Sequence, residues 1–418
     1  MKILKTLISS LIFILIFSIQ ANGQNQECAS DLIHKQLLQS NPDYFNKSQQ
    51  LENEIREIIN NHRNRLNPNE VYTIPVVVHV IHLGEPIGTG TNISDAQIIG
   101  AIAGLNERWN NTYGGAHDYG VDIQVQFCLA SRDPNGNPTT GINRVDASTI
   151  PSYVAYGMNT STTNPNCNGS SETTIKDLSK WPVGSYYNIW VVNIICPNGV
   201  VGFARFPNGN AYDGITMKYS HMIYESHVLA HEMGHGFNLY HTFEGSGSTN
   251  CPVETDCSVN GDHVCDTPPQ KGGDCGTTNS CSATGDWTNS IYNIMSYCVN
   301  RLKFTQGQKD RIRATSIVAP RLSLLSSLGC TTALGINDNE LDKFIIFPNP
   351  ADDKITIQLT NNINNGKFEI FNLIGEKMIE QNVTNSKIEI NVNSFPIGVY
   401  LVKYSNSDFI ITNKLIVD

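Results

Sequence analysis

The sequence HEMGHGFNLYH, residues 231–241, decides how this chain is interpreted. It places His231 and His235 four positions apart, and residues four apart share one face of an α-helix. Two imidazoles on one face can bind a single zinc ion, and Glu232 beside them can take a proton from a zinc-bound water. The spacing therefore predicts a zinc-binding helix with its own general base, although a five-residue match also occurs by chance.

A third histidine, His241, follows six residues after His235. On a straight helix it would lie about 9 Å further along the axis, at roughly 1.5 Å per residue, and would face elsewhere. We therefore expect the helix to end and the chain to bend back, helped by the flexible Gly236 and by Asn238, which tolerates the left-handed conformation. Three histidines plus water make an open zinc site, which is the catalytic kind.

Apolar patterns around this motif predict an α/β (α+β) fold in which helices pack on a mixed sheet. Tyr72–His82 is rich in β-branched residues and predicts a buried strand, and Val121–Phe127 alternates as a half-buried strand does. Ser94 and Gln97 form a capping box that begins a helix. Further elements are expected as an inner strand over 187–195, short edge strands over 200–206 and 215–218, and a helix over about 305–323.

The N-terminus predicts export. Lys2 and Lys5 precede an apolar run at 7–19 that is too short to span a membrane, so residues 1–23 are expected to be a signal peptide. Residues 24–66 are polar with one helical stretch and form an expected propeptide. No later segment is long and apolar enough to span a bilayer, so the mature protein is expected to lack a transmembrane segment.

Composition narrows the class of protein. The 418 residues are 40% hydrophobic and 16% charged, which is enough for a sizeable core and argues against wholesale disorder. The net charge is −10 without a Lys/Arg cluster, so we expect no nucleic-acid partner. Eleven cysteines, many of them closely spaced, favour an oxidising compartment. Short alternating runs after residue 344 predict a small all-β sandwich over 344–418, joined by a linker at 331–343.

The zinc motif also carries a family resemblance. HExxHxxGxxH with a downstream methionine marks the metzincin metallopeptidases. Here Asn238 replaces the usual Gly, and Met295 in NIMSY (293–297) matches the Met-turn. The runs HTFEG (241–245) and GDHVCDTP (261–268) make residues 72–315 resemble the pappalysin family. The resemblance implies a catalytic domain over 67–330 that acts as a zinc endopeptidase on proteins or peptides.

The resemblance implies the same zinc ligands and general base that the motif indicates, and it adds further roles. His231, His235 and His241 would bind zinc, Glu232 would be the general base, Met295 would lie beneath the metal, and Tyr297 would stabilise the oxyanion. Asp262, Asp266 and Thr267 match a structural calcium loop, although ordinary turn chemistry would also explain them. Some relatives carry Asp at the position of Asn300 to select basic substrates, so that preference is in doubt here.

Cysteine pairing and latency are expected from the same resemblance. It suggests Cys251–Cys281 and Cys275–Cys298, leaving Cys257–Cys265 as a local pair. Cys28 stands alone, and Glu27-Cys28-Ala29-Ser30 loosely resembles a propeptide motif. A thiolate is a strong zinc ligand, so Cys28 is a candidate latency switch, released by cleavage near Arg63 or Arg65. A merely structural cysteine is the alternative.

The last region resembles the C-terminal sorting domain of the type IX secretion system of Bacteroidetes. Its landmarks are FPNPA (347–351), GEK (375–377), GVYLV (398–402) and KLIV (414–417). The resemblance implies export through the periplasm by that machinery to the medium or the cell surface. An accessory sandwich that binds carbohydrate or protein is the alternative for this region.

Two other functions remain open from the sequence. One is a secreted binding or adhesion protein with a structural zinc site, which retention of Glu232 argues against because such a site needs no base. The other is a zinc hydrolase that acts on a non-peptide bond.

Overall fold

The structure, a computed structural model, describes residues 27–331 and 344–418 apart from short gaps. The gaps are residues 62–65, 68–69, 116–119, 161–165, 248–249, 254, 283, 299, 360–365, 373–374, 384, 386 and 407–409. The expected signal peptide, all but the first residue of the expected linker, and Arg63 and Arg65 therefore lie outside the described residues. The chain divides into two compact units, residues 1–331 and 332–418.

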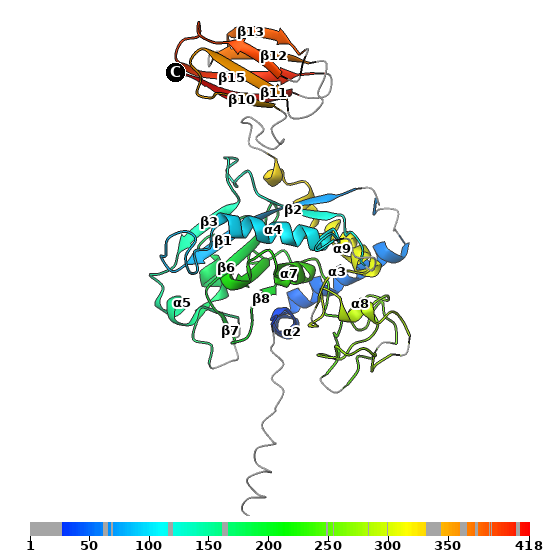
Figure 1. Cartoon of the computed structure of the whole chain (residues 1–418). Helices are drawn as coiled ribbons and strands as arrows, with labels where there is room; N and C mark the ends of the chain where they lie inside the picture. Colours follow the sequence, from blue (N-terminus) through cyan, green and yellow to red (C-terminus); the bar gives the residue numbers. More distant parts are fainter. Residues whose placement is uncertain are drawn as a thin grey trace, which may run out of the picture. The chain divides into compact units, whose positions relative to one another are not determined.

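The first unit is built on one mixed sheet with the strand order β2-β1-β6-β9-β8, and β3 also pairs with β1 (Figure 1). All pairs are parallel except β8 with β9, so the predicted mixed sheet is confirmed. The strands are β1 (Tyr72–His82), β2 (Val125–Leu129), β3 (Ile142–Asp146), β6 (Tyr187–Val192), β8 (Gly202–Ala204) and β9 (Gly214–Lys218). A small parallel sheet joins β4 (Met158–Asn159), β5 (Ser170–Ser171) and β7 (Ile195–Cys196).

Strand β1 lies inside the sheet, and its sequence explains why. Val76, Val78 and Val80 bury on one face, while Val77 and Ile81 bury on the other. A parallel strand covered on both faces has no polar side, which accounts for its nearly continuous apolar run. The expectation of a buried strand at these residues is therefore confirmed.

Two helices on one face of the sheet share its main core. Ser94 begins α4 by accepting a hydrogen bond from the Gln97 amide, as predicted, although the Gln97 side chain donates to the Met222 carbonyl instead. Trp109 at the end of α4 packs against α7, with its indole nitrogen 3.4 Å from the Ala230 carbonyl oxygen. The helices are α2 (Ser30–Ser40), α3 (Pro42–Asn61), α4 (Asp95–Trp109), α5 (Pro151–Tyr156), α6 (Glu172–Lys176), α7 (Val228–Gly236), α8 (Thr288–Ile291), α9 (Gln306–Ser316) and α10 (Leu322–Leu325).

Four expectations about these elements are wrong. The polar segment over residues 24–66, called the leader from here on, forms two helices, α2 and α3, rather than one. Strand β2 begins only at Val125, because Gln124 adopts a positive φ of 59° that breaks the extended backbone. Strand β9 lies between β6 and β8, so of the two predicted edge strands only β8 is one. The long helix expected over 305–323 divides into α9 and α10 around Pro320, which cannot continue a helix.

The second unit is the predicted all-β sandwich. Its two antiparallel sheets have the orders β10-β11-β14 and β13-β12-β15-β16, and they enclose one apolar core. The strands are β10 (Phe344–Phe347), β11 (Lys354–Leu359), β12 (Lys367–Asn372), β13 (Lys377–Asn382), β14 (Lys387–Asn391), β15 (Gly398–Ser405) and β16 (Ile410–Val417).

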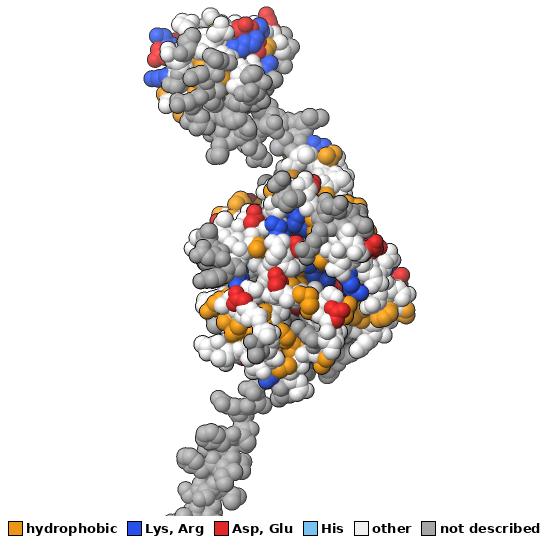
Figure 2. Space-filling model, turned by 90° about the vertical axis from the view of Figure 1, so that its right-hand side faces the viewer, with side chains coloured by type: hydrophobic (Ala, Val, Ile, Leu, Met, Phe, Trp, Pro, Cys, Tyr) orange, Lys and Arg blue, Asp and Glu red, His pale blue; other side chains and the backbone are white. Residues whose placement is uncertain are grey.

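The surface is mixed in character. On the face of the first unit that Figure 2 shows, acidic, basic and hydrophobic side chains lie in small interspersed groups. Among the described helices, none combines the length and apolar character that crossing a bilayer requires.

Candidate metal centre and catalytic site

Helix α7 and the turn after it bring the three motif histidines together. His231 and His235 lie on α7, which ends at Gly236, and Asn238 then takes a φ of 68°. The chain returns so that the Nε2 atom of His241 lies 3.1 Å from Nε2 of His231 and 3.2 Å from Nε2 of His235. The predicted helix end and left-handed turn are therefore confirmed.

Each of these histidines is held by its other ring nitrogen. The Nδ1 atom lies 2.7 Å from the Ile294 carbonyl oxygen in His231 and 2.8 Å from the Leu239 carbonyl oxygen in His235. A carbonyl can only accept, so these two Nδ1 atoms donate and both Nε2 lone pairs point toward the common centre.

The third histidine depends on the leader, because the Nδ1 atom of His241 lies 2.7 Å from Oδ2 of Asp31 on α2. The rings are buried, and burial lowers the pKa of His235 to about 3 and that of His231 well below its usual value. His241 in turn holds the pKa of Asp31 well below its usual range, although burial alone would raise it. Neutral imidazoles with converging Nε2 atoms fit a zinc ion.

Met295 lies directly against the zinc-binding helix. A Cβ atom added at Gly234 would stand 2.4 Å from the Met295 sulfur, so only glycine allows this approach. The turn that carries Met295 is held by Asn293, whose side-chain oxygen accepts from the Met295 amide at 2.9 Å. Asn293 also exchanges two hydrogen bonds with Gln308 on α9. The structure thus places Met295 against the helix that carries His231 and His235.

Glu232 faces the leader from the same helix. Its Oε2 atom accepts a hydrogen bond from the Ser30 hydroxyl at 3.0 Å and lies 3.3 Å from the Cys28 sulfur. The side chain is fully buried, and burial raises the pKa of Glu232 to about 8. In this arrangement the leader covers the carboxylate.

Cys28 is seated at the centre of the site. Its sulfur and one ring nitrogen of each of His231, His235 and His241 all lie within 4.8 Å of one another. The Glu27 carbonyl accepts from the Val201 amide at 2.8 Å, and the Ala29 amide donates to the Gly202 carbonyl at 3.2 Å. The leader therefore extends the sheet at the free edge of β8. The Tyr297 hydroxyl donates to the Cys28 carbonyl at 3.4 Å.

A second leader contact lies behind the site, at Glu52 on α3. Its carboxylate lies 2.6 Å from the Arg311 guanidinium, 3.0 Å from the Asn238 amide nitrogen, 3.1 Å from the Tyr240 hydroxyl and 3.2 Å from Nδ1 of His263. Burial alone would raise the pKa of Glu52, but Arg311 and His263 hold it well below its usual range. His263 is half-buried where its ring meets this carboxylate.

The two aspartates of the acidic loop after the histidines accept hydrogen bonds from different parts of the chain. Asp262 accepts hydrogen bonds from the Thr267 hydroxyl at 2.6 Å and from the Val264 amide at 3.0 Å. Asp266 instead binds the start of α9, accepting from the Thr305 hydroxyl at 2.7 Å and from the Gly307 amide at 2.9 Å. The structure thus brings Asp262 and Thr267 together, whereas the Asp266 carboxylate takes partners on α9.

Asn300 and the cysteines complete the predicted residues. Asn300 is exposed with a φ of 67°, and the next residue, Arg301, is buried and pairs with Glu27. Cys28 is free in the structure. The disulfides are Cys251–Cys281, Cys275–Cys298, Cys257–Cys265, Cys128–Cys330 and Cys167–Cys196, and the first three are the pairs that the resemblance suggests.

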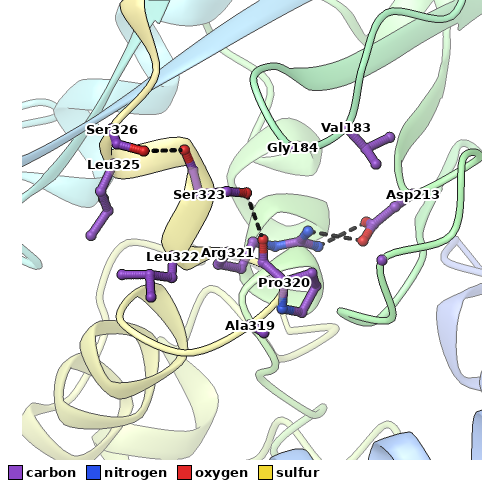
Figure 3. Close-up of a pocket in the computed structure, with 11 residues that line it drawn as sticks. Val183, Gly184, Asp213, Ala319, Pro320, Arg321, Leu322, Ser323, Leu325 and Ser326 are labelled. Carbon is purple, nitrogen blue, oxygen red and sulfur yellow. Dashed lines mark hydrogen bonds and ion pairs between the residues drawn. The ribbon is translucent and has the colours of Figure 1, made fainter.

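A cavity of about 710 Å³ lies apart from the histidines (Figure 3). Its charged groups satisfy each other, since the Arg321 guanidinium makes two contacts of 2.8 Å and 2.9 Å with the Asp213 carboxylate. Arg321 also donates to the Gly236 carbonyl at the end of α7. The cavity therefore borders a structural ion pair that supports the zinc-binding helix.

The leader residues Asp31 and Glu52, their partner Arg311, and Arg301, which pairs with Glu27, were not predicted from the sequence. Asp31 lies 210 positions from His241, and Glu52 lies 259 positions from Arg311. No spacing rule connects residues so distant. The one available signal was that an acidic residue in a polar leader helix, here Glu52, lies on the buried side among apolar residues.

Comparisons with known proteins agree with this geometry. Residues 169–316 match the family described as pregnancy-associated plasma protein-A, and residues 345–418 match the secretion system C-terminal sorting domain. An extracellular metalloprotease from Arthroderma otae is 29% identical over 204 residues, which cover 43% of this chain and 70% of the relative. One from Sordaria macrospora is 34% identical over 132 residues, covering 27% and 42%.

A solved structure adds a likeness over most of this chain. A promirolysin variant from Tannerella forsythia has a TM-score of 0.52 and 27% sequence identity. The match covers 72% of this chain and 97% of that one. The expected metzincin-type fold is thereby confirmed.

Proposed function

The chain is a secreted metalloendopeptidase with a catalytic domain of the pappalysin family, and from this premise we propose which of its residues perform the reaction. We assign zinc to His231, His235 and His241, the general base to Glu232, and oxyanion stabilisation to Tyr297. The converging Nε2 atoms of the three histidines carry this proposal. The alternative of a secreted binding protein with a structural zinc is not favoured.

Each of these groups is assigned a separate role in peptide-bond hydrolysis. Bound zinc supplies a Lewis acid that polarises the scissile carbonyl and acidifies a water. The Glu232 carboxylate lies 3.3 Å from the Cys28 sulfur, which stands among the three histidines, so it would take the proton from the attacking water there and deliver it to the leaving amine. The Tyr297 hydroxyl, which donates to a backbone carbonyl in this structure, donates to the oxyanion of the substrate carbonyl.

The described structure supports a latent precursor. Cys28 lies where water and substrate would enter, Ser30 covers Glu232, and the leader backbone occupies the edge of β8. Extended peptides add to free sheet edges, so substrate and leader compete for this edge. In this proposal Cys28 is the fourth zinc ligand of the precursor, and removal of residues 24–66 opens the site.

Calcium is the remaining part of the proposal. Asp262 is fully buried, and its loop offers carboxylate and carbonyl oxygens, which are the ligands that calcium prefers. Ca²⁺ added to calcium-free protein should raise the midpoint of thermal unfolding, and Asp262→Asn should abolish that rise. If calcium left the midpoint unchanged, the loop would be held by its hydrogen bonds alone.

Casein digestion by the full-length precursor, activated by limited proteolysis, tests the function. We expect Glu232→Ala to lower the rate by about 10³-fold or more while zinc content is unchanged. Removal of zinc with a chelator should abolish activity, and added zinc should restore it. Activity that survived in Glu232→Ala would contradict the assigned base.

A further inference from the structure

Arg301 is a buried cation beside the zinc site. Its side chain is 6% exposed, and it lies on the loop that follows the Met-turn. Its Nε atom donates to the Cys298 carbonyl at 2.9 Å, and its guanidinium carbon lies 5.6 Å from the centre of the Tyr297 ring. These contacts hold the guanidinium with its remaining nitrogens directed away from the loop, toward the leader.

The carboxylate that Arg301 meets comes from the leader. A terminal nitrogen of Arg301 lies 2.6 Å from Oε2 of Glu27, whose side chain is 39% exposed. Among the described residues, Glu27 is the one acid that forms an ion pair with Arg301. Removal of the leader would take this carboxylate away and leave a guanidinium whose N–H groups favour a new carboxylate.

The position of Glu27 relates this carboxylate to the scissile bond. Glu27 immediately precedes Cys28, whose sulfur lies among the zinc-binding histidines. The Glu27 and Ala29 backbone groups pair with Val201 and Gly202 at the β8 edge, where a substrate peptide would add. A substrate peptide that adds to this edge in place of the leader would bring one of its side chains to the position of Glu27, next to the residue at the histidines.

We propose that Arg301 forms a specificity subsite that selects a substrate with Glu or Asp next to the scissile bond. This inference rests on the proposed function and adds the chemical class of its substrates. A carboxylate in the subsite restores the ion pair that Glu27 makes, whereas a neutral amide of the same shape leaves guanidinium N–H groups without a charged acceptor. Asn300, the candidate from the sequence, is exposed and carries no charge.

The test uses the full-length precursor after proteolytic activation and pairs of peptides that differ only as Glu or Gln beside the cleaved bond. We expect kcat/KM to be about 30-fold higher for the Glu peptide, as a charge-assisted hydrogen bond in a buried site implies. Arg301→Gln should bring this ratio close to one, and Arg301→Glu should favour a Lys peptide instead. Arg144→Gln is the matched control, since Arg144 pairs with Asp95 away from the β8 edge.

A second measurement uses only the wild-type enzyme, so it does not depend on whether the variants fold. Wild-type enzyme is given a peptide library, and the residues on both sides of each cleaved bond are read. Enrichment of Glu and Asp at one flanking position supports the proposal. Cleavage that depends on Glu232 and zinc but shows no acidic preference overturns it and leaves the proposed function intact. Loss of the preference in Asn300→Gln but not in Arg301→Gln would also overturn it. If no peptide is cleaved by zinc-loaded wild type, the proposed function itself fails.

Discussion

The two sides of the zinc site are built differently. On the catalytic side, His231 and His235 are oriented by carbonyls of the catalytic domain, and Gly234 lets Met295 approach. On the leader side, Cys28, Asp31 and Glu52 reach the site from a segment more than 180 residues away in sequence. Two of the three histidine rings are thus oriented by the catalytic domain itself, whereas the orientation of His241 also depends on Asp31 of the leader.

Replacing Cys28 should reduce the latency of the precursor, and this is the largest effect that we expect. We expect the Cys28→Ala precursor to digest casein about 100-fold faster than the wild-type precursor before any proteolysis, because losing a buried ligand costs roughly 3 kcal/mol and each 1.4 kcal/mol is tenfold. Ser40→Ala at the exposed end of α2 is the control and should stay latent. A Cys28→Ala precursor that remained fully latent would show that helices α2 and α3 block the site without the thiol.

Glu52 tests whether the leader has a second anchor. Glu52→Gln leaves Arg311 buried without a charged partner and should lower the free energy of unfolding of the precursor by about 3 kcal/mol, measured by urea denaturation. Glu54→Gln, on the same helix and bonded only to Gln50 in the described contacts, should change it by less than about 0.5 kcal/mol.

The same pair of variants contains an internal control. If residues 24–66 are removed as proposed, position 52 leaves with them, and the fully processed Glu52→Gln enzyme is identical to the wild-type enzyme. Its kcat/KM must therefore equal the wild-type value after complete activation. An effect that persisted there would mean that the leader also directs folding of the catalytic domain.

The sequence predicted the catalytic side and the sheet far better than it predicted the leader side. Spacing within eleven residues determines which histidines can converge, and Asn238 at the turn was recognisable because few residues tolerate a positive φ. The buried strand at 72–82 was equally clear from its continuous apolar run. Each of these features depends on residues that are close together in the sequence, so the sequence alone is enough to predict it.

The leader contacts could not be predicted because their partners lie far apart in the chain. Asp31 and Glu52 look like ordinary acidic residues of polar helices until Arg311 and His241 are placed beside them. Pro320 is a different case, since a proline inside the expected helix over 305–323 was a local signal for a break.

Gly234 tests how tightly the catalytic side of the site is packed. Gly234→Ala places a methyl group 2.4 Å from the Met295 sulfur, so we expect a loss of about 2 kcal/mol in the free energy of unfolding and weaker zinc binding. Gly100→Ala on α4 meets its nearest neighbour at 3.7 Å and should stabilise the protein by about 0.5 kcal/mol. Thermal unfolding of both variants checks the opposite signs, and equal effects would show that the Met295 contact can relax.

The smallest expected effect is the pH dependence of the Glu52 anchor. Because the pKa of Glu52 is lowered in the folded precursor, its contribution is present above the pKa of the unfolded chain and is lost as pH falls toward the folded value. The stability difference between wild type and Glu52→Gln should therefore stay constant from pH 8 to about pH 5. Below about pH 4 it should shrink, by at most about 1.4 kcal/mol per pH unit. A difference that already changed between pH 7 and pH 5 would contradict this assignment, because neither Glu52 nor Arg311 titrates in that range.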